Sequence, residues 1–305
     1  MENTTTVKVK ICGLTCEEDL RTAMSAGADF AGMVLFYPKS RRNVDISLAR
    51  RLIGQSSWSG PQLGWESAGW MNSDAFIDPD QFIDPEKFGD EAPAQISDEV
   101  EDASVWSDDS AENDIKWVAV TVSPTPDQVR DIEAAGFDYI QIHGDFDPDI
   151  LKLSCFEEKA EDENNDGWVD LDDEADKQLK IIRAYNRMGD KQLEEIKQLN
   201  DVDAVEFYLL DAAEPGSGKS FDWNGIPDSS ILCKPMFLAG GLKPDTVEDT
   251  IKVIEQLTGS KPFAVDVSTG VEKDELPSAE DIAAGVSMKD SEKVKEFIDN
   301  AKKVK

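Results

Sequence analysis

Several residues with reactive side chains come directly after short apolar segments that have the composition of buried strands. Cys12 follows VKVKI, His143 follows DYIQI and Asp211 follows VEFYLL. Thiol, imidazole and carboxylate groups are the ones that proteins use for acid–base and nucleophilic chemistry. Taken alone, Cys12 is also compatible with a small buried hydrophobe, and Asp211 with a turn or a helix cap. Their common position after a strand is what makes them candidates.

These residues would be positioned by an alternation of apolar strands and helical segments. The predicted strands are 7–11, 29–36, 116–122, 138–142, 180–185, 205–210, 235–240 and 262–267. The predicted helical segments are 17–26, 46–53, 126–136, 148–153, 191–199, 244–257 and 291–303. Continuous Val/Ile/Leu-rich strands separated by helices indicate a parallel sheet, and eight such units close into a (β/α)8 TIM barrel. Active-site side chains of such barrels lie at the carboxyl ends of the strands, including Arg183 here.

Most of the charge falls in two segments of the 305-residue chain, whose formal net charge is -33. Residues 54–115 hold 16 acidic groups and one basic group, and residues 155–178 hold 11 acidic and two basic groups. The remaining 219 residues carry a net charge of -9 and have the size of a compact barrel. We interpret both segments as insertions in a single barrel domain, 1–305, on the face opposite the active site. The first, with its FIDPDQ-FIDPEK repeat, is interpreted as turn-rich or disordered.

Composition excludes several classes of partner and site. A strong negative charge repels nucleic acid and anionic membranes, so we expect neither as a partner. The sequence lacks a long apolar run and a signal-peptide core, which predicts a cytoplasmic protein. Four cysteines without C-x-x-C spacing and a single histidine argue against structural zinc and against a disulfide framework.

Seven segments, in chain order, resemble the motifs of the phosphoribosylanthranilate isomerase family of tryptophan biosynthesis. They are KICGLT, ADFAGMVLFYPKSRRNV, IQIHGD, YLLDA, GSGKSFDW, FLAGGLKPDTV and DVSTGVE, and they touch every predicted strand except those of KWVAVTV and KIIRAY. The resemblance implies an Amadori rearrangement of N-(5-phosphoribosyl)anthranilate to 1-(2-carboxyphenylamino)-1-deoxyribulose 5-phosphate, with no cofactor required. Such a reaction needs an acid that protonates the ring oxygen as it leaves and a base that removes the C2 proton.

The resemblance also implies roles for individual residues. Cys12 matches the family's general base and Asp211 its general acid. Because a thiol with a pKa of about 8.5 is mostly protonated at neutral pH, we expect positive potential at Cys12, supplied by Arg42 or by helix N-termini. Arg42 matches the arginine that holds the anthranilate carboxylate, while Arg41 departs from the family's usual proline. His143 matches the family's HG and is given a supporting role.

The substrate phosphate is expected on the backbone N–H groups of two loops. The loops are those of Gly240 and Gly241 and of Ser268, Thr269 and Gly270. The segment 272–290 follows the second loop and should lie on the catalytic face, and the sequence leaves open whether it closes as a lid.

Two further motifs invite other interpretations. EPGSGKS mimics a nucleotide-binding loop, but Ala213 stands where the first glycine belongs, so we do not assign nucleotide binding. DENNDGWVDLDD has calcium-loop spacing, with oxygen donors at Asp162, Asn164, Asp166, Asp170 and Asp173. Aspartate replaces the bidentate glutamate at its twelfth position and no second loop is present, so a solvated acidic loop is the simpler interpretation. Any Ca²⁺ bound there would be structural.

Two alternative functions stay open at this point. One is another phosphate-binding barrel isomerase or epimerase, although those typically use paired aspartates. The other is an interaction protein that binds a basic partner through the acidic, Trp-rich insertion 54–115. For the isomerase, the expected partner is the phosphosugar–anthranilate substrate, and the expected state is a monomer or homodimer.

Overall fold

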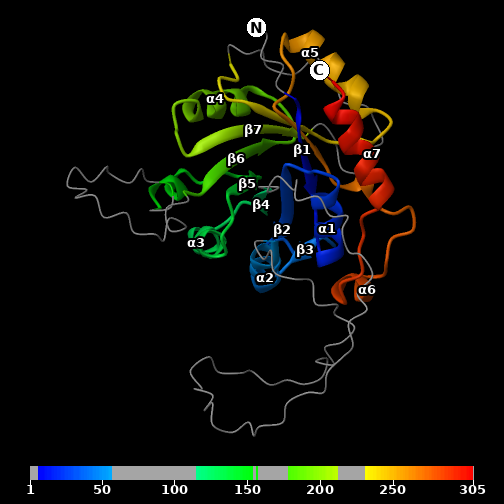
Figure 1. The fold of residues 1–305 in the computed structure, drawn as a ribbon. Coiled ribbons are helices and arrows are strands. Elements are labelled where there is room, and N and C mark those ends of the chain that lie inside the picture. The colour runs from blue at the N-terminus through cyan, green and yellow to red at the C-terminus, as the bar shows by residue number, and fades with distance from the viewer. Residues whose placement is uncertain (1–5, 57–114, 154–155, 157–177, 212–230, 305) are drawn as a thin grey trace, which may run out of the picture. The chain divides into compact units, whose positions relative to one another are not determined.

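The computed structural model describes residues 6–56, 115–153, 156, 178–211 and 231–304, all within one compact unit. Parallel strands form a closed sheet, and helices cover its outer side (Figure 1). The barrel strands are β1 (Lys8–Cys12), β2 (Phe30–Leu35), β4 (Lys116–Val122), β5 (Tyr139–His143), β6 (Lys180–Tyr185), β7 (Val205–Asp211), β8 (Met236–Ala239) and β9 (Ala264–Val267). The pairing of β1 with both β2 and β9 closes the barrel, and the two-residue β3 (Asn43–Val44) pairs with the end of β2. The predicted (β/α)8 TIM barrel is confirmed.

The helices follow the strands in the predicted order. They are α1 (Glu17–Ser25), α2 (Ile46–Ser56), α3 (Pro126–Ala134), α4 (Asp190–Leu199), α5 (Val247–Thr258), α6 (Ala279–Ala283) and α7 (Ser291–Lys302), with 3-10 helices η3 (Pro148–Lys152) and η7 (Thr269–Val271). Two predictions need correction. PDILKL forms the 3-10 helix η3 and not an α-helix, and α5 begins at Val247 because a turn from Lys243 to Thr246 precedes it.

Local sequence signals explain where the helices begin. Thr125 and Gln128 form a capping box at the start of α3, and Pro126 occupies its first turn. The Asp290 side chain caps α7 by accepting from the backbone N–H groups of Glu292 and Lys293. α7 then buries one apolar face against β1, α1 and α5, which anchors the end of the described chain to its first strand.

Side chains of the strands alternate between two layers, as the period of a β-strand requires. The outer layer packs between sheet and helices, whereas the inner layer fills the barrel. Phe30, Phe207 and Phe237 interlock in the inner layer, with ring centroids 5.1 Å (Phe30–Phe237) and 5.2 Å (Phe207–Phe237) apart in edge-to-face geometry. Cys12 belongs to this inner layer and is 8% exposed. The layer that carries the candidate chemistry is therefore continuous with a packed aromatic core.

Several predictions fall on residues that the structure does not describe. They are the order and placement of insertions 54–115 and 155–178 apart from their edges, the calcium-loop motif and the GSGKSFDW segment. They stay predictions. Among the helices that the structure describes, none combines the length and apolar character needed to cross a membrane.

Candidate active site

One level of the inner layer brings four polar or small residues into a row across adjacent strands. Asp211 on β7 pairs in register with Ala239 on β8, Ala239 with Asp266 on β9, and Asp266 with Lys10 on β1. Ala239 belongs to the inner layer. Asp211 lies two residues after Leu209 and four after Phe207 on β7, so it is on the same inward face of the strand as those two inner-layer residues. Cys12 lies one inward position beyond Lys10. The two predicted catalytic residues therefore lie on the inward face at the carboxyl ends of β1 and β7.

Cys12 lies in a tightly packed position at the end of β1. A Cβ at Gly32 would come within 3.1 Å of both Cys12 Sγ and Lys10 Cε, so the absence of a side chain on β2 makes room for the pair. Burial raises the pKa of the Cys12 thiol. The charges of Lys10 and, to a smaller extent, Lys289 lower this pKa, whereas the charge of Asp266 raises it further. Lys10 and Lys289, which sequence reasoning did not name, are the cations with the largest effect on the thiol, and the expected contribution of Arg42 or helix N-termini stays a prediction. Because burial outweighs the two lysines, the thiol is protonated at neutral pH in the unliganded site.

A chain of buried polar contacts runs from Lys10 across the barrel interior to His143. Lys10 is fully buried, and its Nζ donates to Asp266 Oδ2 at 3.0 Å and to Gln141 Oε1 at 2.9 Å. Gln141 Nε2 lies 2.7 Å from His143 Nε2, and His143 Nδ1 lies 3.2 Å from Asn186 Oδ1. An amide donor on one ring nitrogen and a carbonyl acceptor on the other assign the neutral Nδ1–H tautomer.

The ionisation of this chain follows from burial and pairing. Burial lowers the pKa of His143, so its imidazole is neutral at pH 7. Burial also acts to lower the pKa of Lys10, but Asp266 and Cys12 together outweigh it and the pKa is raised. Sequence reasoning missed Lys10, Gln141 and Asp266. The available signal was a polar residue at an inward-facing position inside an apolar strand.

Arg42 crosses close to Gly13, the residue after Cys12, and is held by the Glu272 carboxylate from late in the chain. Arg42 Nε donates to Glu272 Oε1 at 2.6 Å, and Nη2 donates to Glu272 Oε2 at 3.0 Å and to Thr269 Oγ1 at 2.9 Å. A Cβ at Gly13 would lie 2.4 Å from Arg42 Cδ. The Arg42 side chain can therefore pass over the backbone at position 13 only because that residue is glycine. Arg41, where the resemblance in sequence leads us to expect proline, also donates to Glu272 Oε2, at 3.1 Å.

The two predicted phosphate loops are in direct contact with each other. Gly240 and Gly241 adopt φ values of 95° and 65°, a region that favours glycine. A Cβ at Gly270 would lie 1.9 Å from the Leu242 carbonyl oxygen, so the loops after β8 and β9 touch through their backbones. Within the described residues, the N–H of Gly241 donates to no acceptor and the buried Ser268 Oγ has no hydrogen-bond partner. Both are donors that a phosphate oxygen could satisfy.

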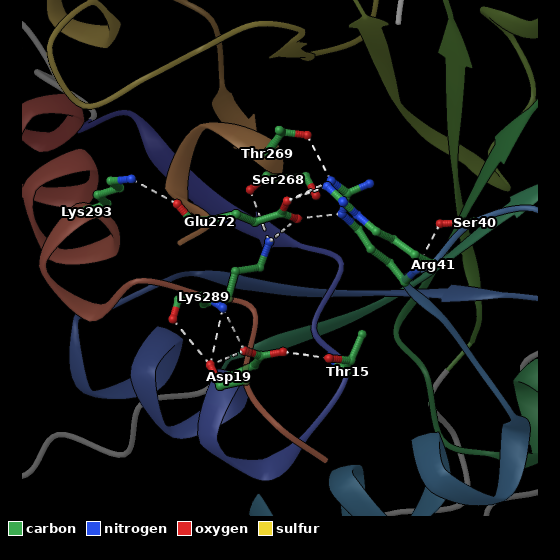
Figure 2. A network of polar contacts seen from close by, with 11 residues as sticks. Thr15, Asp19, Ser40, Arg41, Ser268, Thr269, Glu272, Lys289 and Lys293 are labelled. Atoms are coloured by element: carbon green, nitrogen blue, oxygen red, sulfur yellow. Dashed lines mark hydrogen bonds and ion pairs between the residues drawn. The ribbon is translucent and has the colours of Figure 1, made fainter. Parts of the chain in front are cut away.

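Lys289 supports the second loop from below, which sequence reasoning did not anticipate. Its fully buried ammonium donates to the Ser268 carbonyl oxygen at 3.1 Å and lies 3.6 Å from Glu272 Oε1. Asp19, also fully buried, accepts from Lys289 N at 3.1 Å and from Ser287 Oγ at 2.7 Å (Figure 2). The segment 272–290 is thus fastened at its base, whereas no residue of α6 at its tip is buried.

A pocket of about 640 Å³ opens beside His143, at the ends of β2, β4, β5 and β6. Arg183 lines it but does not face the barrel axis as its strand-end position predicted. Its guanidinium donates to Glu195 Oε1 on α4 at 2.6 Å and to the carbonyls of Ile142 and Gly144, both at 2.8 Å. The expectation was wrong because the side chain of Arg183 lies on the outward face of β6, between Ile182 and Ala184, which both point into the barrel. No cluster of three or more His, Cys, Asp or Glu side chains suited to a metal ion occurs in the described ranges.

Comparisons with known proteins find similarity to phosphoribosylanthranilate isomerases. Residues 165–300 match the model of the family described as N-(5'phosphoribosyl)anthranilate (PRA) isomerase. The chain is 29% identical to the N-(5'-phosphoribosyl)anthranilate isomerase of Streptococcus gordonii, over 97% of each chain. It is 28% identical to that of Streptococcus mutans, over 97% of this chain and 99% of the relative.

Two solved structures share the fold. Phosphoribosyl anthranilate isomerase from Thermotoga maritima is 24% identical with a TM-score of 0.57, over 97% of this chain and 99% of that chain. A phosphoribosyl anthranilate isomerase in complex with reduced 1-(o-carboxyphenylamino)-1-deoxyribulose 5-phosphate is 23% identical with a TM-score of 0.53, over the same shares.

Proposed function

We infer that this chain is a member of the N-(5'-phosphoribosyl)anthranilate isomerase family and converts N-(5-phosphoribosyl)anthranilate into 1-(2-carboxyphenylamino)-1-deoxyribulose 5-phosphate. It is an isomerase of tryptophan biosynthesis. The observation that carries the mechanism is the placement of a thiol and a carboxylate on the inward face of one barrel mouth, which Arg42 and two glycine-rich loops also border.

The two ends of the substrate call for different binding groups. The anthranilate carboxylate would bind Arg42, whose side chain passes close to Gly13, the residue after Cys12. The phosphate would bind backbone N–H groups of Gly240, Gly241 and the Ser268–Gly270 loop, which the Gly270–Leu242 contact holds together. The sugar would then span the mouth between these loops and Cys12, so that its C2 faces the thiol.

The reaction moves protons and breaks one carbon–oxygen bond. Asp211 donates a proton to the ring oxygen as the nitrogen lone pair expels it, which leaves an open-chain iminium ion. Cys12, as thiolate, removes the C2 proton, and the electron pair moves towards nitrogen to give an enolamine. Return of a proton to C1 and loss of the enol proton at C2 yield the aminoketone. Atoms and charge balance without a cofactor.

The buried lysines explain how a protonated thiol can still serve as the base. Lys10 and Lys289 both favour the thiolate, so they stabilise the ionised thiol once it forms. Only a small fraction of Cys12 is ionised at neutral pH, since burial raises its pKa. We therefore expect the rate to increase with pH into the alkaline range, because each unit below the pKa costs a factor of about ten in thiolate.

The test is the loss of substrate fluorescence with the purified chain and with variants of both residues. Cys12→Ala and Asp211→Asn should each reduce kcat by about a hundredfold or more while leaving the melting temperature nearly unchanged. Cys16→Ala is the matched control. Cys16 is also buried, but it lies at the start of α1 and has a pKa of about 11. An inactive wild-type chain would reject the function, and full activity in the Cys12 and Asp211 variants would reject only their roles.

Three finer expectations accompany this function. We propose a cytoplasmic location, a small-molecule substrate as the main partner, and a monomer or homodimer. Sedimentation of the purified chain would decide between a monomer and a homodimer. The calcium-loop motif at 162–173 is a separate proposal, and a titration with Ca²⁺ at constant ionic strength would test it.

A further inference from the structure

We propose that Glu272 is a positioning residue that holds the guanidinium of Arg42 in the orientation needed to receive the anthranilate carboxylate. This inference rests on the proposed isomerase function. It concerns a residue that the substrate does not need to touch, and it assigns a purpose to the cluster of ion pairs around Glu272 (Figure 2).

The geometry of the pair fixes both the position and the plane of the guanidinium. Glu272 accepts from Nε and Nη2 along one edge of Arg42, at 2.6 Å and 3.0 Å, which is a bidentate arrangement. The other N–H of Nη2 donates a hydrogen bond to Thr269 Oγ1, with the two atoms 2.9 Å apart. In the described part of the chain, Nη1 makes no hydrogen bond, so this nitrogen is left to a ligand. An arginine held in this way loses little side-chain entropy when the substrate binds.

Charge in the cluster favours an additional anion. The Glu272 carboxylate is 2% exposed and faces the cations of Arg41, Arg42 and Lys289. Asp19, which faces Lys289, adds a second carboxylate, and two carboxylates against three cations still leave a formal positive excess. Burial raises the pKa of Glu272, but the Arg42 hydrogen bond together with the neighbouring cations lowers it overall, so the carboxylate is ionised at neutral pH. Glu272 thus fixes Arg42 without cancelling the attraction that a substrate carboxylate would experience.

The backbone of Glu272 is itself held at the end of the second phosphate loop. Its N–H donates to the Thr269 carbonyl at 3.1 Å, its carbonyl accepts from Lys293 Nζ at 3.0 Å, and it bridges to Lys289. Glu272 follows η7 directly, so the loop expected to bind phosphate also fixes the residue that orients Arg42. The same short segment would therefore set the spacing between the two anionic ends of the substrate.

A purely structural ion pair is the competing explanation, and substrate chemistry separates the two. Glu272→Gln keeps the shape of the side chain but loses one acceptor and the charge. We expect about a tenfold higher KM for N-(5-phosphoribosyl)anthranilate with kcat changed less than about threefold, because Arg42 is no longer held in place. With N-(5-phosphoribosyl)aniline, which lacks the carboxylate, KM should not change. Glu272→Asp, which keeps the charge, should recover part of the loss.

A double-mutant cycle and a binding measurement complete the test. In an Arg42→Ala background, Glu272→Gln should have no further effect on KM, because its action passes through Arg42. Fluorescence titration with the reduced product analogue should show the same weakening of Kd without turnover. Equal KM changes for both substrates, or none for either, would overturn the inference while wild-type turnover still supports the isomerase. A wild-type chain that neither binds the analogue nor turns over would reject the proposed function itself.

Discussion

Replacing Lys10 with methionine should raise the pKa of the Cys12 thiol and lower turnover in proportion to the lost thiolate. Lys10 is fully buried in the inner layer beside Cys12, and it is the largest influence that opposes the effect of burial on the thiol. Methionine has a similar length and fills the space without a charge. The variant therefore removes one electrostatic contribution and keeps most of the packing.

The size of the effect follows from the charges that surround the thiol. Two unit charges about 4 Å apart interact by about 4 kcal/mol at an effective dielectric constant of about 20, which is about three pKa units. Asp266 lies 3.0 Å from Lys10 Nζ and repels the thiolate, so it cancels part of this attraction. We expect a net rise of about one to two units in the pKa of Cys12. Below that pKa, kcat/KM should fall about 10- to 100-fold and its increase with pH should shift to higher pH.

A second variant guards against a trivial loss of the fold. Lys10→Met leaves Asp266 buried without its cation, which destabilises proteins by about 3–5 kcal/mol. Lys10→Met/Asp266→Asn removes both charges, so it should be more stable than the single variant and have a Cys12 pKa between those of the single variant and the wild type. The assay is the pH dependence of iodoacetamide alkylation, read at the Cys12 peptide by mass spectrometry. The same midpoint in all three proteins would refute the reasoning.

Three other perturbations follow from the same contacts. Gly270→Ala would force a Cβ against the Leu242 carbonyl and separate the phosphate loops, so inorganic phosphate should inhibit at least about tenfold more weakly. Gly241→Ala meets no neighbouring atom and is disfavoured only by its φ of 65°, so it should weaken inhibition less. Asp19→Asn perturbs a carboxylate that accepts four hydrogen bonds, and should lower the free energy of unfolding in urea by about 2–4 kcal/mol. Replacing residues 275–286 with a short glycine linker should leave kcat/KM within about threefold, because α6 has no buried residue. A larger loss in steady-state kinetics would indicate a lid.

The strands could be predicted because their physical requirement is local. A strand covered on both faces needs a continuous apolar run, and the eight runs agree with the observed strands to within two residues at either end. The positions of Cys12, His143 and Asp211 at strand ends followed from the same runs. PDILKL shows the limit of such patterns, because its apolar spacing is also compatible with the single 3-10 turn that forms after Asp147.

The environment of the site could not be predicted, because it depends on closure of the barrel. Lys8 and Lys10 lie two residues apart on the same face of β1, yet the Lys8 side chain is 46% exposed and Lys10 is fully buried. Only the ring of strands distinguishes them. Arg42 and Glu272 are 230 positions apart, and their contact requires β9 to return beside β1. The effect of burial on the pKa of Cys12 could not be predicted for the same reason, since a sequence shows neither how deeply the thiol is buried nor which lysines lie beside it.

The overall charge of the chain opposes the local charge of the site, and ionic strength should separate the two. The substrate carries a carboxylate and a phosphate, whereas the whole chain has a formal net charge of -33. At an ionic strength of about 0.01 M the Debye length is about 30 Å, so charges far from the mouth repel the substrate; at about 0.15 M it is about 8 Å. The cluster of Arg41, Arg42 and Lys289 around Glu272 then dominates.

We therefore expect kcat/KM to increase between these ionic strengths and kcat to stay constant, since kcat concerns substrate that is already bound. This is the reverse of the salt dependence of enzymes whose net charge attracts their substrate. Titration with KCl at fixed pH measures both parameters. A kcat/KM that falls with added salt would mean that the buried cations control association even when screening is weakest, and that the acidic residues elsewhere in the chain do not act on the approaching substrate.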